Sequence, residues 1–293
     1  MIKINITESI IKEFLKSIVN KNCKISQFKL NEIEITYNYI KFKDKKCKFL
    51  SNIQKFLDIF KTSSYKVEEL LLGDIFKISK QHPIIENTIV KNAYDTLRNK
   101  WGHKLINLTK IDVCPYCNRN YIFNFNKTQT TVELDHFFPK SNYPHLALNI
   151  YNLIPSCHTC NNHKNNDTKL HFYPYEENFN DSVKFKYKYN NLSDIEIEFD
   201  IKNNVEKAKN HIEIFNLEHL YNKHKDIVLE LIQKREIYSD TYINELTTQY
   251  PNMFNNKEDV LRLITCGYVD DKDLHKRPLS KLIKDISEEL GFL

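Results

Sequence analysis

The chain has 293 residues, of which 41% are hydrophobic and 28% charged, and its formal net charge is +5. This composition is typical of a soluble globular protein with one large domain or two modest ones. Four glycines are too few for a glycine-rich phosphate loop, which excludes a P-loop nucleotide hydrolase. No apolar run reaches the ~18 residues of a membrane span, and the N-terminus lacks a signal peptide's apolar core, so we expect a cytoplasmic protein. The mildly basic charge permits nucleic-acid binding without arguing for it.

The first hundred residues mix helical and strand patterns. Apolar residues at helical spacing predict an amphipathic N-terminal helix. These residues are Ile10, Ile11, Phe14, Leu15, Ile18 and Val19. Residues 25–43 favour strand, because they are rich in Ile, Tyr and Phe with partial alternation. Residues 49–61 and 84–101 predict helices, and Pro83 suits the start of the second.

A hairpin is predicted over residues 183–201. The segment VKFKYKY alternates apolar residues with lysine, IEIEFDI alternates them with acids, and NNLSD supplies turn residues between them. If the strands pair, lysines can face acids on one side. Residues 206–249 return to a helical pattern that ends at Pro251, and a last helix is expected to start near Pro278. We divide the chain into a mixed region 1–100, a core 101–175, and a hairpin with helices at 176–293.

Two Cys-x-x-Cys pairs form the strongest motif of the chain. They are CPYC at 114–117 and CHTC at 157–160. In a chain without a signal peptide, such pairs indicate metal binding rather than disulfides. Two unrelated pairs of buried thiols, or a redox motif, are the alternatives. Four cysteines close a tetrahedral shell and leave no open position for water, so we expect a structural zinc that clamps the residues between the pairs.

Asp135 and His136 lie inside that clamp. Strands are expected at Tyr121–Phe125 and Thr131–Phe137, followed by a short strand and a helix that begins near the second cysteine pair. Hydrolysis of a phosphodiester needs a base that activates water and a cation that neutralises charge. Asp135 is a hard oxygen ligand suited to Mg²⁺, and His136 can accept a proton near neutral pH. Neighbours on a strand point to opposite faces, so a bend at the strand end is needed for both to act.

The residues ELDHFFPKS and YNLIPSCHTCNNHK together resemble the HNH endonucleases, the ββα-metal nucleases. The matching positions are Asp135-His136, Asn152-Leu153 and Cys157-x-x-Cys160-Asn161-x-x-Lys164. The resemblance covers roughly residues 101–170. It implies an α+β fold in which a zinc-stapled ββα-metal core is flanked by mainly helical regions with a small β-hairpin.

The resemblance also implies a role for each matching residue. His136 matches the general base, Asp135 the first metal ligand, and Asn152 the middle Asn that ties the loop together and orients the base. Asn161 matches the third position, often His in this family, which binds the catalytic Mg²⁺ or Mn²⁺; Asn there makes this the HNN subtype. His163 or His158 is an alternative ligand.

Two further residues are candidate contacts of nucleic acid. We expect Lys164 either to contact a phosphate or to serve only in packing. His145 lies in the loop and could approach a phosphate.

The residues of the motif are also similar to those of HNH proteins of bacterial anti-phage systems, such as the nuclease subunit of Septu systems, which partners an ABC-type ATPase. We therefore expect a metal-dependent endonuclease that acts on nucleic acid in bacterial anti-phage defence, with DNA favoured over RNA and both left open, and with an ATPase as a candidate partner. The alternative is a non-cleaving, zinc-stapled adaptor that binds nucleic acid or a partner protein. The adaptor would need the four cysteines but not Asp135 or His136.

Overall fold

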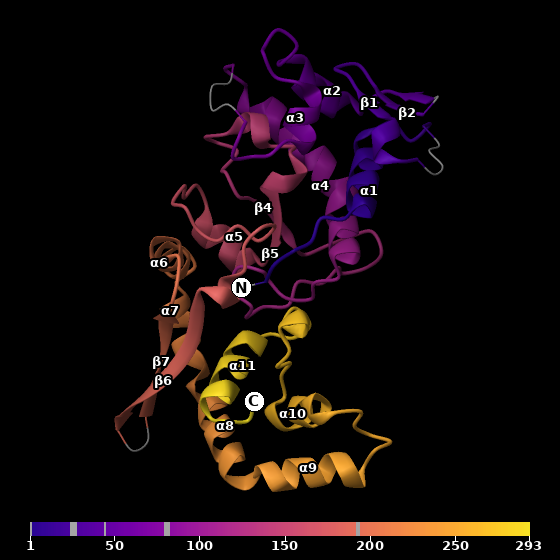
Figure 1. Ribbon diagram of the computed structural model, residues 1–293. Coiled ribbons are helices and arrows are strands. Elements are labelled where there is room, and N and C mark those ends of the chain that lie inside the picture. The colour runs from indigo at the N-terminus through magenta and orange to yellow at the C-terminus, as the bar shows by residue number, and fades with distance from the viewer. Residues whose placement is uncertain (1, 24–27, 44, 79–82, 192–193) are drawn as a thin grey trace. The chain divides into compact units, whose positions relative to one another are not determined.

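The computed structural model describes residues 2–23, 28–43, 45–78, 83–191 and 194–293, and the chain divides into two compact units (Figure 1). The N-terminal unit comprises Asn5–Lys110 and Ile122–Thr168. The C-terminal unit comprises Met1–Ile4, Ile111–Tyr121 and Lys169–Leu293. Both units are discontinuous in sequence, whereas the regions expected at 1–100, 101–175 and 176–293 are each continuous. The division into these three ranges therefore stays a prediction from the sequence.

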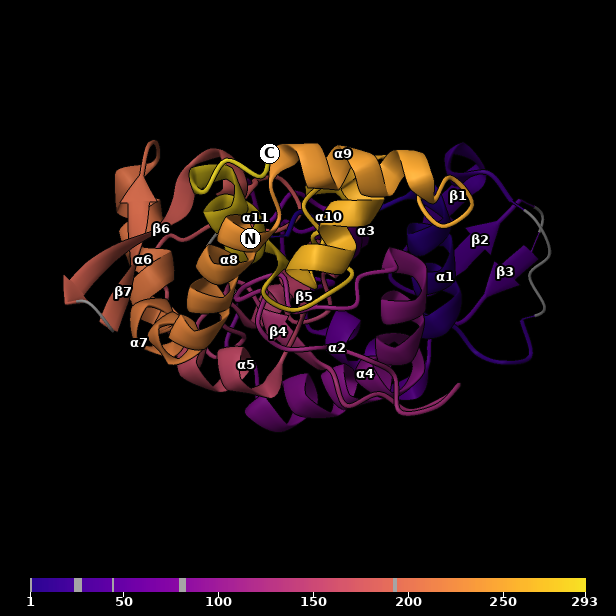
Figure 2. The same cartoon turned by 90° about the horizontal axis from the view of Figure 1, so that it is seen from below.

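The N-terminal unit combines helices with two small antiparallel sheets. Its helices are α1 (Glu8–Ile18), α2 (Ser51–Asp58), α3 (Val67–Leu72), α4 (Asn87–Thr109) and α5 (His158–Lys164). One sheet contains β1 (Ile33–Ile35), β2 (Ile40–Phe42) and β3 (Lys45–Cys47), and the other contains β4 (Glu133–His136) and β5 (Leu153–Ser156). Figure 2 shows the first sheet beside α1. Short 3-10 turns at Leu30–Glu32, Pro144–Leu146 and Ile150–Asn152 connect these elements.

Helix α4 organises the core of this unit. It packs against both α1 and α2. Its Trp101 is fully buried and meets Phe14 of α1 edge-on, with ring centroids 5.5 Å apart. Since the same core includes Leu134 of β4 and Leu153 of β5, it also supports the second sheet.

The predicted elements of this unit form with shifted boundaries. The N-terminal helix is α1, and the Thr7 side chain caps it by accepting a hydrogen bond from the Ile10 amide. The strand predicted at 25–43 forms two short strands, β1 and β2, while residues 25–27 lie outside the described residues. The second predicted helix starts at Asn87 and extends to Thr109 as α4.

The strand predicted at Tyr121–Phe125 was wrong. The segment makes only isolated bridges within the described part of the chain, at Val113–Tyr121 and Asn124–Thr130.

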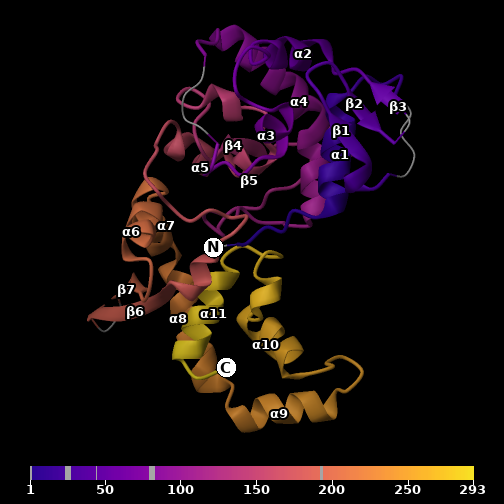
Figure 3. The ribbon, with the colours of Figure 1, turned by 45° about the horizontal axis from the view of Figure 1, so that its top comes forward.

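The C-terminal unit is a hairpin with a group of helices. Its elements are β6 (Val183–Asn191), β7 (Asp194–Ile201), α6 (Val205–Ile214), α7 (Leu217–Tyr221), α8 (Lys225–Ile237), α9 (Asp240–Gln249), α10 (Lys257–Thr265) and α11 (Ser280–Glu289), with 3-10 turns at Phe179–Asp181, Asn222–His224 and Asp271–Asp273. Figure 3 shows β6 and β7 running beside α8 and α11. Strands β6 and β7 pair antiparallel, which confirms the predicted hairpin, and Lys186 lies opposite Glu198. The helical pattern of 206–249 is divided among α6 to α9, and Asn216, in a left-handed conformation, separates α6 from α7.

Within the described ranges, no helix is both long and apolar enough to cross a membrane.

Candidate active site

The site is built on β4, β5 and α5. The two strands pair antiparallel, with Asp135 opposite Ile154 and His136 opposite Leu153. Side chains alternate along β4, so neighbouring residues face opposite sides. Leu134 and His136 face α4, where the Tyr94 hydroxyl donates to the Leu134 carbonyl at 2.8 Å. Asp135 faces α5. The expected ββα arrangement is therefore present, with α4 covering its second side.

The His136 side chain is held in one tautomer. Its Nε2 lies 3.0 Å from the carbonyl oxygen of Ala147, which can only accept a hydrogen bond, so Nε2 carries the proton. Nδ1 then keeps a free lone pair. The imidazole packs on the Tyr94 ring at a centroid distance of 4.6 Å. Burial, together with the positive charge of Lys140, lowers the pKa of His136 to about 3, so the ring is neutral at physiological pH. An unprotonated Nδ1 can accept a proton, and the fixed orientation of the ring, rather than its lowered pKa, is what suits it to act as a base.

Asp135 is buried beside a buried lysine. The Lys164 ammonium, on the last residue of α5, lies 3.1 Å from Oδ2 and 3.2 Å from Oδ1 of Asp135. It also donates to the carbonyl oxygen of His136 at 2.6 Å. Lys164 thereby ties α5 to β4 and balances the Asp135 charge, as a buried ion requires.

Asn152 closes the loop that follows β4. Its side-chain oxygen accepts from the Phe138 amide at 2.8 Å, and its side-chain nitrogen donates to the Phe138 and Leu146 carbonyls at 3.0 and 3.2 Å. The residue is fully buried. Ala147 directly follows Leu146, so the contact of Asn152 with the Leu146 carbonyl helps to position the neighbouring carbonyl that orients His136.

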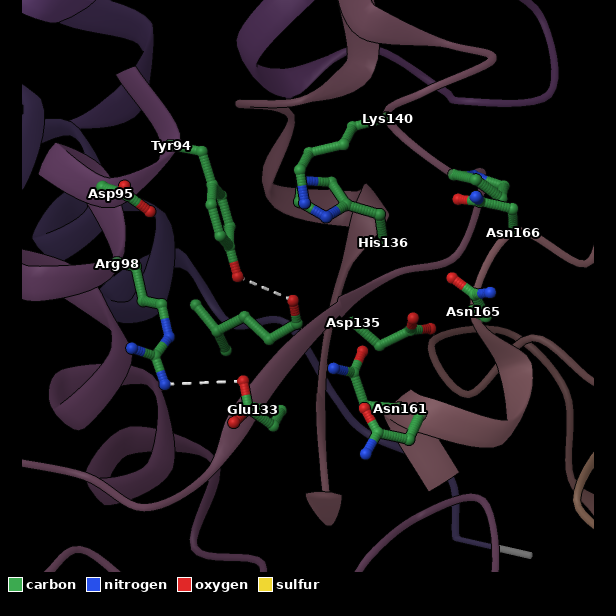
Figure 4. A pocket seen from close by; sticks show the side chains of 13 residues that line it. Tyr94, Asp95, Arg98, Glu133, Asp135, His136, Lys140, Asn161, Asn165 and Asn166 are labelled. Carbon is green, nitrogen blue, oxygen red and sulfur yellow. Dashed lines mark hydrogen bonds and ion pairs between the residues drawn. The ribbon is translucent and has the colours of Figure 1, made fainter. Parts of the chain in front are cut away.

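A pocket of about 600 Å³ opens at this site. Asp135, His136 and Asn161 all line it. Figure 4 shows Tyr94, Asp95 and Arg98 of α4 on one side, and Asn161, Asn165 and Asn166, from α5 and the turn after it, on the other. A carboxylate with amide oxygens is a donor set that fits a hard divalent cation. Asp135 and Asn161 are therefore compatible with such an ion.

Four other histidine and lysine candidates are not part of the pocket lining. His145 is buried and stacked on Tyr65 at a centroid distance of 5.6 Å, and Lys164 is committed to Asp135. These placements give no support to a phosphate contact by either residue. His158, 72% exposed, lies 3.7 Å from Glu133, and His163 is exposed; neither lines the pocket.

Two parts of the pocket lining could not be recognised in the sequence: the residues of α4, and Lys140 in the loop after β4. Asp95 and Arg98 lie about one turn apart on α4, and Arg98 reaches Glu133 of β4 at 3.5 Å. The available signal was the rarity of arginine, since the chain contains five. Nothing in the local pattern of α4 indicates that it faces residues about 40 positions later.

The four motif cysteines lie together. Their sulfur atoms are all within 4.8 Å of one another, and all four residues are buried. A tetrahedral zinc–thiolate site has sulfurs about 3.8 Å apart, so the set fits zinc with little adjustment. Backbone amides also point at the sulfurs, from Arg119 to Cys117 at 3.4 Å and from Cys160 to Cys157 at 3.5 Å. Such amides stabilise thiolates.

Comparison with known proteins agrees with this geometry. The family model of the HNH endonucleases matches residues 114–167. Septu protein PtuB of Bacillus thuringiensis is 35% identical over 68 residues, which cover 22% of this chain and 25% of that protein. Protein ea31 of Escherichia phage lambda is 25% identical over 125 residues, covering 41% of this chain and 36% of that protein. The chain thus matches only about a quarter to a third of each relative. No solved structure matches significantly.

Residues 114–167 therefore form an HNH endonuclease domain, and the resemblance drawn from the sequence is confirmed. The four cysteines, Asp135, His136, Asn152 and Asn161 all fall within it.

Proposed function

We propose that the chain is a metal-dependent endonuclease that hydrolyses phosphodiester bonds, with DNA favoured over RNA. The observation that carries this proposal is the placement of His136. A neutral imidazole, fixed by the Ala147 carbonyl and next to Asp135, lines an open pocket inside an HNH domain.

In this mechanism, Nδ1 of His136 takes a proton from water, which then attacks the phosphorus in line. The Ala147 carbonyl stabilises the imidazolium that forms, and Asn152 supports its position by binding the carbonyl of the preceding residue, Leu146. Asp135 and Asn161 would hold Mg²⁺ or Mn²⁺, which supplies charge neutralisation at the phosphate and at the departing 3′ oxygen. The product carries a 5′ phosphate.

The direct test is cleavage of supercoiled plasmid DNA by the purified protein with Mg²⁺ or Mn²⁺, with single-stranded RNA as a parallel substrate. We expect nicked or linear plasmid when the divalent ion is present and intact plasmid when EDTA is added. Equal cleavage with and without EDTA would contradict metal dependence. Binding of DNA with no cleavage of either substrate would favour the adaptor function.

The four cysteines should retain zinc through purification. We expect about one zinc ion per chain in the wild type and a loss of most of it in Cys157→Ser, because three thiolates bind zinc more weakly than four. Metal content measured by mass spectrometry checks this. Cys266→Ser is the matched control, since Cys266 is an exposed cysteine outside the cluster. Equal zinc in all three proteins would contradict the assignment.

We also propose that the nuclease acts in the bacterial cytoplasm, in anti-phage defence, with an ATPase as its partner. The similarity to Septu protein PtuB supports this setting. Co-purification of a tagged chain from its native host, followed by an ATPase assay on the captured proteins, tests the partner.

A further inference from the structure

Lys140 is the cation of the pocket that carries no ion pair or hydrogen bond among the described residues. It follows β4 in the loop that starts at Phe137, and it lines the pocket together with Asp135 and His136 (Figure 4). Its side chain is half-buried, and its ammonium lies 4.9 Å from the centroid of the Tyr94 ring. The same ring packs on His136, so Lys140 is positioned beside the candidate base.

The other cations that approach this site are already balanced. Arg98 pairs with Glu133 at 3.5 Å, and Lys164 pairs with Asp135 at 3.1 Å. Partial burial of the Lys140 ammonium costs stability, and the contact with the Tyr94 ring and the negative charges of Asp95 and Asp135 offset only part of that cost, so that burial still lowers the pKa of Lys140. An anion entering the pocket would recover the rest. Lys140 is therefore the group in the described pocket lining that gains most from an incoming phosphate.

We propose that Lys140 binds a non-bridging oxygen of the scissile phosphate, an inference that rests on the proposed nuclease function. An ammonium is a compact point charge that can donate to one phosphate oxygen without a fixed fork geometry. Negative charge on the non-bridging oxygens has to be stabilised as water attacks, so a positioned cation lowers the barrier of the chemical step. Lys140 would then supply charge from the loop side, while His136 handles the proton.

The test compares Lys140→Met and Lys140→Arg with wild type in single-turnover cleavage of plasmid DNA and single-stranded RNA with Mn²⁺. Lys55→Met is the matched control, since Lys55 is exposed on α2 and its loss changes the net charge equally. We expect Lys140→Met to cleave about 10²-fold more slowly. Lys140→Arg should recover most of that loss, and Lys55→Met should match wild type.

Melting temperature separates phosphate binding from a structural role. Methionine keeps the contact with Tyr94 and removes a charge whose desolvation Asp95 and Asp135 offset only in part, so Lys140→Met should melt at or above the wild-type temperature. A lowered melting temperature in both Lys140 variants would overturn the inference in favour of packing. Cleavage by Lys140→Met at the wild-type rate would overturn it while leaving the nuclease intact. Absence of cleavage by the wild type itself would contradict the proposed function and remove the phosphate role of Lys140 with it.

Discussion

His136→Ala should lower the rate of phosphodiester cleavage by about 10²- to 10⁴-fold, the usual contribution of a general base. The expected loss is large because the ring is buried, neutral and oriented by the Ala147 carbonyl, so no water can replace it in the same geometry. Cleavage of plasmid DNA with Mn²⁺ measures the rate, and zinc content and melting temperature show whether the fold is retained.

His158→Ala is the matched control for this substitution. His158 lies on α5, is largely exposed and lies outside the pocket lining, so its loss should leave cleavage near the wild-type rate. Wild-type cleavage by His136→Ala would remove the base assignment. If both variants keep an activity in cells that needs the cysteines, the adaptor function gains support.

Lys164→Met should lower the free energy of unfolding of the N-terminal unit by about 3–5 kcal/mol, the cost of leaving a buried charge without its partner. Both side chains of the Lys164–Asp135 pair are at least 97% buried, with 0% and 3% of their surfaces exposed. The methionine has a similar length, so the effect comes from the uncompensated Asp135 carboxylate and the lost contact with the His136 carbonyl. Denaturant unfolding followed by tryptophan fluorescence measures it, since Trp101 is the chain's one tryptophan and belongs to this core.

Two further variants test whether the lower stability of Lys164→Met comes from the unpaired Asp135 charge. Adding Asp135→Asn to Lys164→Met removes the unbalanced charge, so the double variant should be more stable than Lys164→Met alone. Lys61→Met breaks a half-exposed pair with Asp58 and should cost less than about 1 kcal/mol. Equal stability of Lys164→Met and wild type would show that Asp135 does not depend on the buried ammonium.

The HNH motif could be predicted from sequence because its signals are local. Cysteine pairs, an Asp-His step and Asn152 occur at spacings that one ββα unit imposes, and the structure brings them together. The surroundings of Lys164 and His145 could not be predicted, since the same residue types serve equally well on a surface. Their burial depends on how α5 packs on β4 and how Tyr65 packs on the loop, which are tertiary features.

The incorrect strand at Tyr121–Phe125 has a physical explanation. Its alternating pattern is real, but the apolar side chains point outward: Tyr121, Phe123 and Phe125 are 49%, 49% and 76% exposed, while Ile122 is buried. Alternation predicts a strand only if a partner strand is available, and the described chain supplies just single bridges here.

The first cysteine pair depends on residues far along the chain. The Asn118 side chain donates to the Leu274 carbonyl at 2.9 Å and accepts from the Lys281 amide at 2.9 Å, and the Tyr221 hydroxyl donates to the Cys117 carbonyl at 2.6 Å. On the ribosome, Cys114 and Cys117 emerge well before these partners are translated. The nascent chain therefore cannot make these three contacts until Lys281 has been synthesised, so the surroundings of the first cysteine pair are completed late in translation.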